Sequence, residues 1–400
     1  MATLAAGQTS TREGEKAAIR IAVLTNFVAP YRIPLFQELA RRVNHLRVLI
    51  STAMESNRRW AVNFGSLDVV VQRNISRSRT WRHPSGFEET VHTHFSYDTV
   101  WQLLRYRPHV MISGEFGFRT LNALVYRLLT GTKLIIWATI SESSEAQREG
   151  IRLALRAVLL RLTHAVITNG RSGARYLAKH GAKQEKIFIV PQTTDVRAFA
   201  AVPLARTARE RKRMIYAGQL VPRKGLVPFL EALALWCKNH PDEQVEFQLS
   251  GDGAERANIE NLQKPRNLRV DMLGNASYAD MPTRYAQAGI MVLPTFADEW
   301  GLVVNEALAS GLPVLGSIYS SAVEDLVTEG VNGWQFRIDD AEDTYRAIDR
   351  CLSTPDNVLE NMRVKAREAS LKITPAYVVD RIMDAVRYTT GDPGENHRRT

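Results

Sequence analysis

The sequence predicts an α/β protein of two domains, each built on a doubly wound parallel sheet. Strand-like and helix-like segments alternate almost throughout, which is typical of parallel sheets covered by helices on both faces. The chain has 400 residues, too many for one ordinary core but suitable for two domains of about 200 residues. The alternation loosens at Thr193–Arg213, a polar stretch with proline and arginine, and then starts again. We therefore expect two halves with one architecture.

The first half is expected to open with a buried strand, Ile19–Thr25, followed by the loop Asn26–Tyr31 and the helix Ile33–Val43. Residues 53–90 are rich in arginine, serine and asparagine, and we expect an extended hairpin or mobile loops there. The other strands expected in this half are Leu46–Thr52, Val110–Ser113, Lys133–Ala138, Ala165–Thr168 and Lys186–Pro191.

The second half repeats the alternation. Its expected strands are Met214–Ala217, Val245–Gly251, Leu268–Leu273, Ile290–Pro294, Pro313–Ser317 and Trp334–Arg337. Its expected helices are Leu226–His240, Glu255–Gln263, Tyr278–Ala288, Leu302–Ser310, Ala341–Ser353, Asn357–Ser370 and Pro375–Tyr388.

The expected domain boundaries follow from this pattern. Residues 1–18 lack the apolar run of a signal peptide and are expected to be a disordered leader. Residues 19–200 would form the first domain and residues 201–374 the second. Residues 375–390 would form a final helix, and the polar residues 391–400 a disordered tail.

The composition argues against a membrane-spanning protein and against a small disulfide-stabilised protein. Hydrophobic residues make up 45% of the chain and charged residues 24%, as in ordinary globular proteins. No apolar run reaches the ~18–20 residues that span a bilayer. The two cysteines, Cys237 and Cys351, each lie in an expected helix, so no disulfide framework is predicted and the chain suits a reducing cytoplasm.

The positive charge is concentrated in the first half. Residues 1–200 carry 28 Lys and Arg against 14 Asp and Glu, whereas residues 201–400 carry 24 against 28. Such a half can bind nucleic acid, anionic lipid or phosphate-bearing substrates. The sequence lacks zinc-ligand spacing, a helix-turn-helix signature and an aromatic RNA-binding motif, so we expect no nucleic-acid partner.

The segment Ile151–Ile167 alternates arginine with apolar residues at helical spacing, which places Arg152, Arg156 and Arg161 near one edge. One interpretation is a core-facing helix with a solvated basic rim. The other is a helix that contacts a membrane surface or a lipid-phosphate acceptor, at the inner face of the cell membrane.

The most informative stretch is Leu293–Val314, in which a strand, a loop and a helix follow one another. Gly311 and Pro313 end the helix, as expected of a C-terminal glycine with proline beyond it. The helix is apolar almost all round and should be buried, yet it contains Glu306. A buried carboxylate costs several kcal/mol unless it has donors, and the ribose hydroxyls of a nucleotide are suitable donors.

The start of the same helix predicts a phosphate site. Gly301 removes a side chain where the backbone N–H groups of Leu302 and Val303 point out of the helix. The loop before it carries two acidic residues, Asp298 and Glu299.

A second stretch, Ile215–Leu226, places Arg223 and Lys224 in a glycine-containing loop between a strand and a helix. Departure of a nucleoside diphosphate leaves negative charge on its phosphates. Cations fixed at that point stabilise the transition state more than the ground state.

Two further loops leave strands at the same sheet edge, where open α/β sheets bind ligands. Leu249–Arg256 has a Gly-Asp-Gly turn but lacks the full dinucleotide-binding spacing, so it most simply positions a loop near the cleft. Ser317–Asp325 places Ser320 and Ser321 where they can approach phosphates.

Together these motifs resemble glycosyltransferase family 4. The resemblance rests on Gly218-x-Leu220, Lys224-Gly225, Gly251-Asp252-Gly253, and an acidic residue followed by seven residues and Glu306. It covers residues 205–340 strongly. In the first half, Asn26–Phe36 and Lys186–Asp195 are similar to the family's first loop and its interdomain edge. The resemblance implies the GT-B fold, two Rossmann-like domains facing a cleft, with the last helix crossing back to the first domain. It also implies retention of anomeric configuration without a metal.

The resemblance also implies roles for individual residues. Glu306 would hold the ribose hydroxyls, Asp298 the hydroxyls of the transferred sugar, and Lys224 the diphosphate. The other expected donor-binding residues are Gly218, Gln219, Arg223, Gly251, Gly253, Gly301, Leu302, Val303, Ser320 and Ser321. On the acceptor side, Tyr31 and Arg32 of the first loop are expected, together with Glu142.

The chain departs from the family pattern at three places. The first acidic position is usually Glu and is here Asp298. The usual arginine before Leu220 is here Gln219, for which Arg223 could compensate. The usual histidine after the strand Lys133–Ala138 is missing, and Glu142 or Ser141 could replace it.

The resulting hypothesis is a retaining enzyme that moves a hexose from a nucleotide-diphosphate sugar to a glycan or lipid-phosphate-linked acceptor, in cell-surface polysaccharide or glycolipid biosynthesis. The acceptor hydroxyl would attack on the face that the diphosphate leaves, with the leaving phosphate as base and closure excluding water. No cofactor is expected. The alternatives are a non-catalytic nucleotide-sugar-binding subunit, a GT-B nucleotide-sugar epimerase and a phosphorylase.

Overall fold

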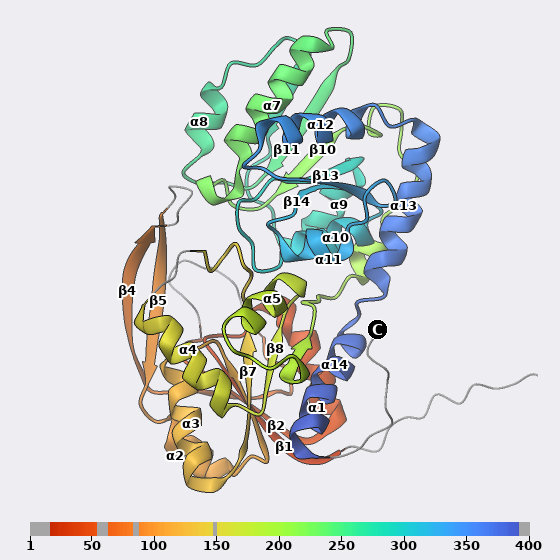
Figure 1. Ribbon diagram of the computed structural model, residues 1–400. Helices are drawn as coiled ribbons and strands as arrows, with labels where there is room; N and C mark the ends of the chain where they lie inside the picture. Colours follow the sequence, from red (N-terminus) through yellow and green to blue (C-terminus); the bar gives the residue numbers. More distant parts are fainter. Residues whose placement is uncertain (1–16, 54–62, 83–87, 147–149, 392–400) are drawn as a thin grey trace, which may run out of the picture.

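The computed structural model describes residues 17–53, 63–82, 88–146 and 150–391. Two α/β domains lie one above the other in Figure 1, and each has a parallel sheet with helices around it. The expected leader falls almost wholly outside the described residues, as does all of the expected tail except Gly391.

The sheet of the N-terminal domain has seven parallel strands in the order β3-β2-β1-β6-β7-β8-β9. Their bounds are β1 Ala17–Thr25, β2 Val43–Ile50, β3 Asp68–Val71, β6 Val110–Gly114, β7 Lys133–Ala138, β8 Ala165–Thr168 and β9 Ile187–Ile189. Alternate residues of the central strand β1 face opposite sides: Ile21 and Val23 enter one core, and Ala22 and Leu24 enter the other. A strand buried on both faces reads as a continuous apolar run, which is why the strands were recognisable.

Different helices cover the two faces of this sheet. α1 (Ile33–Arg42) packs on one face, after the short 3₁₀ turn η1 (Pro30–Arg32). The opposite face is covered by α2 Thr99–Tyr106, α3 Phe118–Thr130, α4 Ile151–Leu162 and α5 Arg171–Lys179. The chain leaves the domain through η2 (Gln184–Lys186), before β9, and α6 (Arg197–Ala200).

Residues 53–90 were expected to form a hairpin or mobile loops. β4 (Asn74–Arg82) and β5 (Glu88–Ser96) pair antiparallel, so the hairpin interpretation is confirmed where the chain is described. The hairpin runs beyond the expected limit, to Ser96, and extends along one side of the domain (Figure 1).

The C-terminal domain has six parallel strands in the order β12-β11-β10-β13-β14-β15. Their bounds are β10 Met214–Ala217, β11 Val245–Ser250, β12 Leu268–Met272, β13 Ile290–Leu293, β14 Val314–Ser317 and β15 Gly333–Phe336. The helical elements around them are η3 Pro222–Lys224, α7 Leu226–Asn239, α8 Arg256–Asn261, η4 Tyr278–Asp280, α9 Met281–Ala286, α10 Leu302–Ala309, α11 Ser321–Leu326, α12 Ala341–Leu352 and α13 Asp356–Leu371. The doubly wound fold expected of both halves is therefore confirmed.

The last helix, α14 (Pro375–Thr390), returns to the N-terminal domain, as expected. It packs beside α1 (Figure 1), and its apolar residues Val378, Val379, Ile382 and Val386 join the core beneath that face of the sheet. Both cysteines are buried and free. Among the described residues, no helix is long and apolar enough to cross a membrane.

Candidate active site

The loops after β10 and β11 meet backbone to backbone at the carboxyl edge of the C-terminal sheet. A Cβ placed on Gly251 would lie 1.8 Å from the carbonyl oxygen of Gly218, and one on Gly253 would lie 2.4 Å from that of Leu220. The Leu220 N–H in turn donates to the Asp252 carbonyl at 3.0 Å. Only glycine permits this approach. The Gly-Asp-Gly turn thus positions the two loops, as its sequence led us to expect.

The basic turn η3 is attached to the neighbouring strand β13. Gly225, which follows Lys224, has φ +64°, and a Cβ there would lie 2.1 Å from the Pro294 carbonyl oxygen. The carbonyl of Arg223 accepts a hydrogen bond from the Phe296 N–H at 2.9 Å. The turn that carries the two cations is therefore held against the loop that carries Asp298.

Lys224 and Asp298 form a direct ion pair. The Lys224 Nζ lies 2.5 Å from the Asp298 Oδ2, and both side chains are 13% exposed. Burial alone would raise the pKa of the Asp298 carboxyl, but the charges of Lys224 and Arg223 hold it below its ordinary value. Residues 74 positions apart are thus brought together as a charged pair.

The replacement of the usual arginine by Gln219 is not simply offset by Arg223. Gln219 is exposed, and its carbonyl accepts a hydrogen bond from the Tyr216 hydroxyl at 2.7 Å. The Arg223 guanidinium donates to the Ala297 carbonyl at 3.0 Å and lies 3.9 Å from the Glu299 carboxylate. Arg223 is therefore directed at the loop before α10 and stabilises that loop.

The start of α10 is shaped by Gly301. This residue has φ +102°, and a Cβ on it would lie 2.8 Å from the Ser320 Oγ. The Ser320 hydroxyl donates to the Trp300 carbonyl, which fixes the chain immediately before the helix. The N–H groups of Leu302 and Val303 belong to the first turn, whose donors have no partner within the helix. Both residues are only half-buried, and an anion site at these donors stays a prediction.

Glu306 lies one turn further along α10 and is buried, as expected. The Tyr285 hydroxyl donates to its Oε2 at 3.2 Å. Burial raises the pKa of Glu306 to about 8. A second tyrosine, Tyr278, is close enough for Glu306 to affect its pKa, and its hydroxyl lies 2.8 Å from that of Thr194. The sequence contained no signal for these two tyrosines.

Ser321 begins α11, beside the acidic loop. Its N–H lies 3.4 Å from the carbonyl of Asp298, and its hydroxyl is buried without a hydrogen-bond partner among the described residues. Ser320 and Ser321 thus lie beside the start of α10, where they were expected, although the Ser320 hydroxyl is engaged in holding the loop.

On the N-terminal side, Tyr31 and Arg32 line a cavity of about 160 Å³ at the carboxyl ends of β1, β6 and β7. Three residues that sequence reasoning missed line it too: Glu115, Arg119 and Trp137. They come from separate segments that the sheet brings together, so spacing along the chain gave no indication of them.

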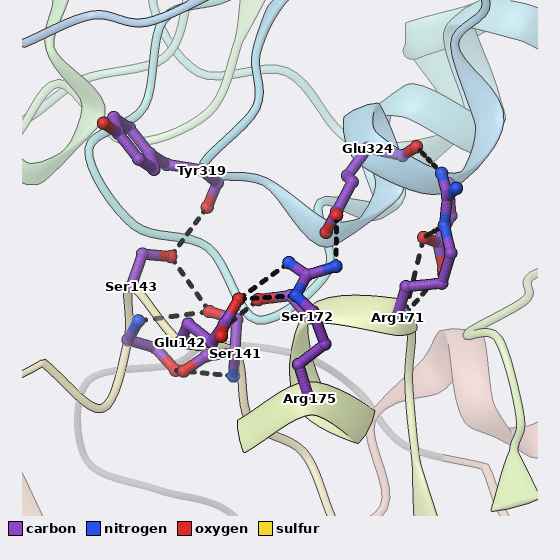
Figure 2. Close-up of polar contacts among 10 residues, drawn as sticks. Ser141, Glu142, Ser143, Arg171, Ser172, Arg175, Tyr319 and Glu324 are labelled. Carbon is purple, nitrogen blue, oxygen red and sulfur yellow. Dashed lines mark hydrogen bonds and ion pairs between the residues drawn. The ribbon is translucent and has the colours of Figure 1, made fainter. Parts of the chain in front are cut away.

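Glu142 lies outside this cavity, in a cluster of polar contacts between the domains (Figure 2). Its carboxylate is 2.7 Å from Arg175 of α5, whose guanidinium also reaches Glu324 of α11 at 2.6 Å. Beside it, Arg171 contacts Asp325 at 2.8 Å. The structure therefore separates Glu142 from Tyr31 and Arg32 and gives it a place at the domain interface.

Metal ligands do not gather in the described part of the chain: it holds no group of three or more His, Cys, Asp or Glu side chains placed to bind a metal. The chemistry available at the site is that of carboxylates, lysine, backbone amides and hydroxyls.

Comparisons with known proteins agree with this geometry. Residues 205–370 match the model of the family described as glycosyl transferases group 1. Alpha-D-kanosaminyltransferase of Streptomyces kanamyceticus is 28% identical over 152 residues, which cover 37% of this chain and 38% of that protein. D-inositol 3-phosphate glycosyltransferase of Corynebacterium kroppenstedtii is 26% identical over 244 residues, 56% of this chain and 53% of that protein. The matches thus span about half or less of these relatives' length.

The fold extends over the whole described chain. The structure of HepE from Anabaena in complex with UDP aligns with a TM-score of 0.68 at 16% identity, covering 92% of this chain and 99% of that chain. The expected GT-B fold and the resemblance to the glycosyltransferase family are therefore confirmed. The family match and the names of the relatives agree on one class of enzyme, the glycosyltransferases.

Proposed function

With residues 205–370 identified as a group 1 glycosyl transferase domain, we propose that this protein transfers a hexose from a nucleotide-diphosphate sugar to a glycan or lipid-phosphate-linked acceptor, with retention of configuration. The proposal places it in cell-surface polysaccharide or glycolipid biosynthesis. The observation that carries it is the buried carboxylate of Glu306 in α10, on the same sheet edge as the Gly301 amide site and Lys224.

The donor would be held by three kinds of contact. Glu306 accepts hydrogen bonds from the two ribose hydroxyls, which provide the donors that its burial requires. The first-turn amides of α10 and the Lys224 ammonium bind the diphosphate. Asp298, released from Lys224, accepts hydrogen bonds from the transferred sugar. The solved structure of HepE contains UDP, which supports a uridine nucleotide as the first donor to test.

The reaction would need no enzymic nucleophile. The acceptor hydroxyl attacks the anomeric carbon on the face that the diphosphate leaves, and the departing phosphate oxygen takes the proton. Lys224 and the α10 amides stabilise the charge that develops on this leaving group. The contacts between α5 and α11 hold the two domains together and so keep water away from the reacting bond.

Contact with an anionic membrane surface is part of the proposal, but through different residues from those first considered. In α4, Arg156 is buried and pairs with Glu145 at 2.5 Å, so the expected solvated rim is wrong at that position. α2 and α3 carry several of the exposed apolar side chains of this domain: Trp101, Leu104, Val125, Leu128 and Leu129.

The Arg105 guanidinium lies 4.7 Å from the centre of the Trp101 ring. Apolar side chains beside arginines suit the headgroup region of a bilayer. We expect the wild type to sediment with phosphatidylglycerol vesicles but not with phosphatidylcholine vesicles. The double substitution Leu128→Ser with Leu129→Ser should weaken this sedimentation. Equal sedimentation of the wild type and the double variant would exclude this surface.

The function is tested first by a thermal-shift screen with UDP, GDP and their sugars, because a bound ligand stabilises the folded state. Transfer of labelled sugar to candidate acceptors follows. Glu306→Ala and Lys224→Ala should each lower turnover by at least ~10² while remaining folded. The matched controls Glu231→Ala and Lys238→Ala, on the exposed face of α7, should retain wild-type turnover.

The outcomes separate the alternatives. Nucleotide binding without transfer to any acceptor would indicate a binding subunit. Release of free nucleotide without an acceptor would indicate an epimerase, and a requirement for orthophosphate would indicate a phosphorylase. Wild-type turnover in both active-site variants would contradict the proposed site.

A further inference from the structure

The N-terminal cavity contains a residue held in an unusual backbone conformation. Glu115 directly follows β6 and has φ +64°, a region that side chains other than glycine and asparagine rarely adopt. Its N–H donates to the Trp137 carbonyl at 3.0 Å, and its carbonyl accepts from the Thr120 hydroxyl. These contacts from β7 and α3 impose the conformation. Strain of this kind concentrates at functional sites.

The strained backbone presents a carboxylate to the cavity. Its Oε1 accepts a hydrogen bond from the Thr139 N–H at 3.1 Å, the one hydrogen bond of this carboxylate among the described residues, and the charges of Arg32 and Arg119 lie close enough to act on it. Burial raises the pKa of Glu115 to about 7. The Glu115 side chain is partly buried, and with one hydrogen bond made it keeps the capacity to accept hydrogen bonds from the hydroxyls of a ligand in the cavity.

A buried donor lies in the same cavity wall. Trp137 is 5% exposed, and its indole N–H has no hydrogen-bond partner among the described residues. Buried indole N–H groups usually find a partner. The cavity wall thus contains one acceptor and one donor that are incompletely satisfied, together with the rings of Phe27 and Tyr31.

The charges around the cavity favour a neutral ligand over a phosphate. The Arg119 guanidinium is already bound to the Gly114 carbonyl at 3.0 Å and to the side chains of Asn26 and Ser51. The Arg32 guanidinium lies 5.5 Å from the centre of the Trp137 ring. The Glu115 carboxylate lies in the same cavity as these two guanidinium groups. A phosphate bound there would be repelled by that carboxylate.

The cavity lies next to the proposed donor site. Glu115 and Trp137 are at the carboxyl ends of β6 and β7, and Asn169 follows the next strand, β8. The Asn169 side chain donates to the Glu299 carbonyl, at 3.4 Å, and Glu299 is adjacent to Asp298. The carboxyl edge that carries the cavity therefore contacts the acidic loop of the other domain.

We infer that this cavity binds one sugar ring of the acceptor, whose hydroxyls donate to the Glu115 carboxylate and accept from the Trp137 indole N–H. Aromatic rings with one carboxylate and one N–H donor match the apolar faces and hydroxyl edges of a pyranose. That the bound sugar is an acceptor rests on the proposed function. A sugar-binding cavity narrows the class of acceptor to a glycan or glycoside.

Binding can be measured without knowing the natural acceptor. The probes are the methyl glycosides of glucose, galactose, mannose and N-acetylglucosamine, each observed by saturation-transfer NMR, with inorganic phosphate as a competitor. The key variant is Glu115→Gly, which removes the carboxylate and adopts positive φ without strain. It should stay folded, with a melting temperature equal to or above that of the wild type.

A matched control exists elsewhere in the domain. Arg107, at the end of α2, is the other described non-glycine residue with positive φ, at +53°. Arg107→Gly relieves the same kind of strain outside the cavity. We expect Glu115→Gly to weaken binding of the preferred glycoside at least ~10-fold, the loss typical of a charge-assisted hydrogen bond, and Arg107→Gly to leave it unchanged.

The outcomes distinguish this inference from the proposed function. If a glycoside binds the wild type and Glu115→Gly weakens that binding, the inference is supported. If in addition no nucleotide binds the wild type, the proposed function alone fails. If no glycoside binds, if phosphate displaces the glycoside, or if Glu115→Gly binds as tightly as the wild type, the inference is wrong. UDP affinity should be equal in Glu115→Gly and the wild type, because the variant leaves the donor site intact.

Discussion

Nucleotide binding should be coupled to proton release at Glu306. Burial raises the pKa of this carboxyl to about 8 in the free protein, so at pH 7 it is mostly protonated. A ribose diol offers two O–H donors, and an ionised carboxylate accepts one with each oxygen, more strongly than the protonated form does. Binding of UDP should therefore select the ionised form and release close to one proton near pH 7.

The expected magnitude follows from the pKa. If only the ionised form binds, the apparent Kd scales with the inverse of the ionised fraction. With a pKa of about 8, the affinity should increase about 50-fold between pH 6 and pH 8 and change little above pH 9. Compared with an exposed glutamate, the raised pKa corresponds to about 5 kcal/mol, which is the cost of ionising Glu306 where the fold buries it.

The same pKa has a consequence for stability, and its sign can be worked out. Between about pH 4.3, where an exposed glutamate titrates, and about pH 8, the folded protein binds a proton at Glu306 that the unfolded chain does not. The contribution of Glu306 to the free energy of unfolding therefore decreases as the pH rises through this range. Glu306→Gln should remove this decrease.

Isothermal titration of UDP at pH 6, 7, 8 and 9, in two buffers of different ionisation enthalpy, measures both affinity and proton release. Glu306→Gln provides the pH dependence of the diphosphate itself, which must be subtracted. Tyr285→Phe removes the hydroxyl that donates to Glu306 and should move the affinity increase to higher pH. If the wild type and Glu306→Gln show the same pH dependence and the same proton count, Glu306 does not hold the nucleotide.

Two other predictions concern the supports of the site. Lys224→Ala removes the ion-pair partner of the partly buried Asp298 and should lower the free energy of unfolding by about 3 kcal/mol. Adding Asp298→Asn should restore most of that stability in urea denaturation but none of the turnover. A double variant as unstable as the single one would contradict this. Gly251→Ala should destabilise the folded protein by several kcal/mol, because its Cβ would collide with the Gly218 carbonyl. The control Gly274→Ala, at a position with φ +65° and open space around it, should destabilise the protein by only about 1 kcal/mol. Equal melting temperatures for the two variants would refute the collision argument.

Most of the fold could be predicted because its signals are local. Several strands are short apolar runs between turn residues, namely β1, β6, β7 and β13. A strand covered by helices on both faces has this pattern because nearly all of its side chains are buried. The crossing of α14 was predicted from resemblance, since nothing in its own amphipathic pattern specifies which domain it covers.

The grouping of the candidate donor-binding residues at one sheet edge was predictable for a similar reason. The key residues lie within two continuous motifs, and Glu306 stood out as one acid in an apolar helix. The direct pairing of Lys224 with Asp298 was not predictable, because it depends on how the loops after β10 and β13 meet. Gly225, packed against Pro294, brings them together.

The acceptor side was predicted only in part. Tyr31 and Arg32 were expected, but Glu115 is an isolated acid in a loop, and its positive φ is imposed by contacts with β7 and α3. Glu142 was expected there as a substitute for the missing histidine, whereas in the structure its carboxylate forms an ion pair with Arg175. Position after a strand does not determine which neighbour a flexible carboxylate finds.

Lys224 and Asp298 of the candidate donor site are paired with each other, which bears on what this site binds. Lys224 is paired with Asp298, so a diphosphate must compete with that carboxylate for the ammonium group. A nucleoside diphosphate alone would leave Asp298 partly buried without a partner, at a cost comparable to breaking a buried ion pair. A complete sugar nucleotide brings hydroxyl donors for Asp298 together with phosphates for Lys224, so both groups stay satisfied. Under the proposed function, the pairing should therefore favour the complete donor over its nucleotide product and should help the product leave after transfer.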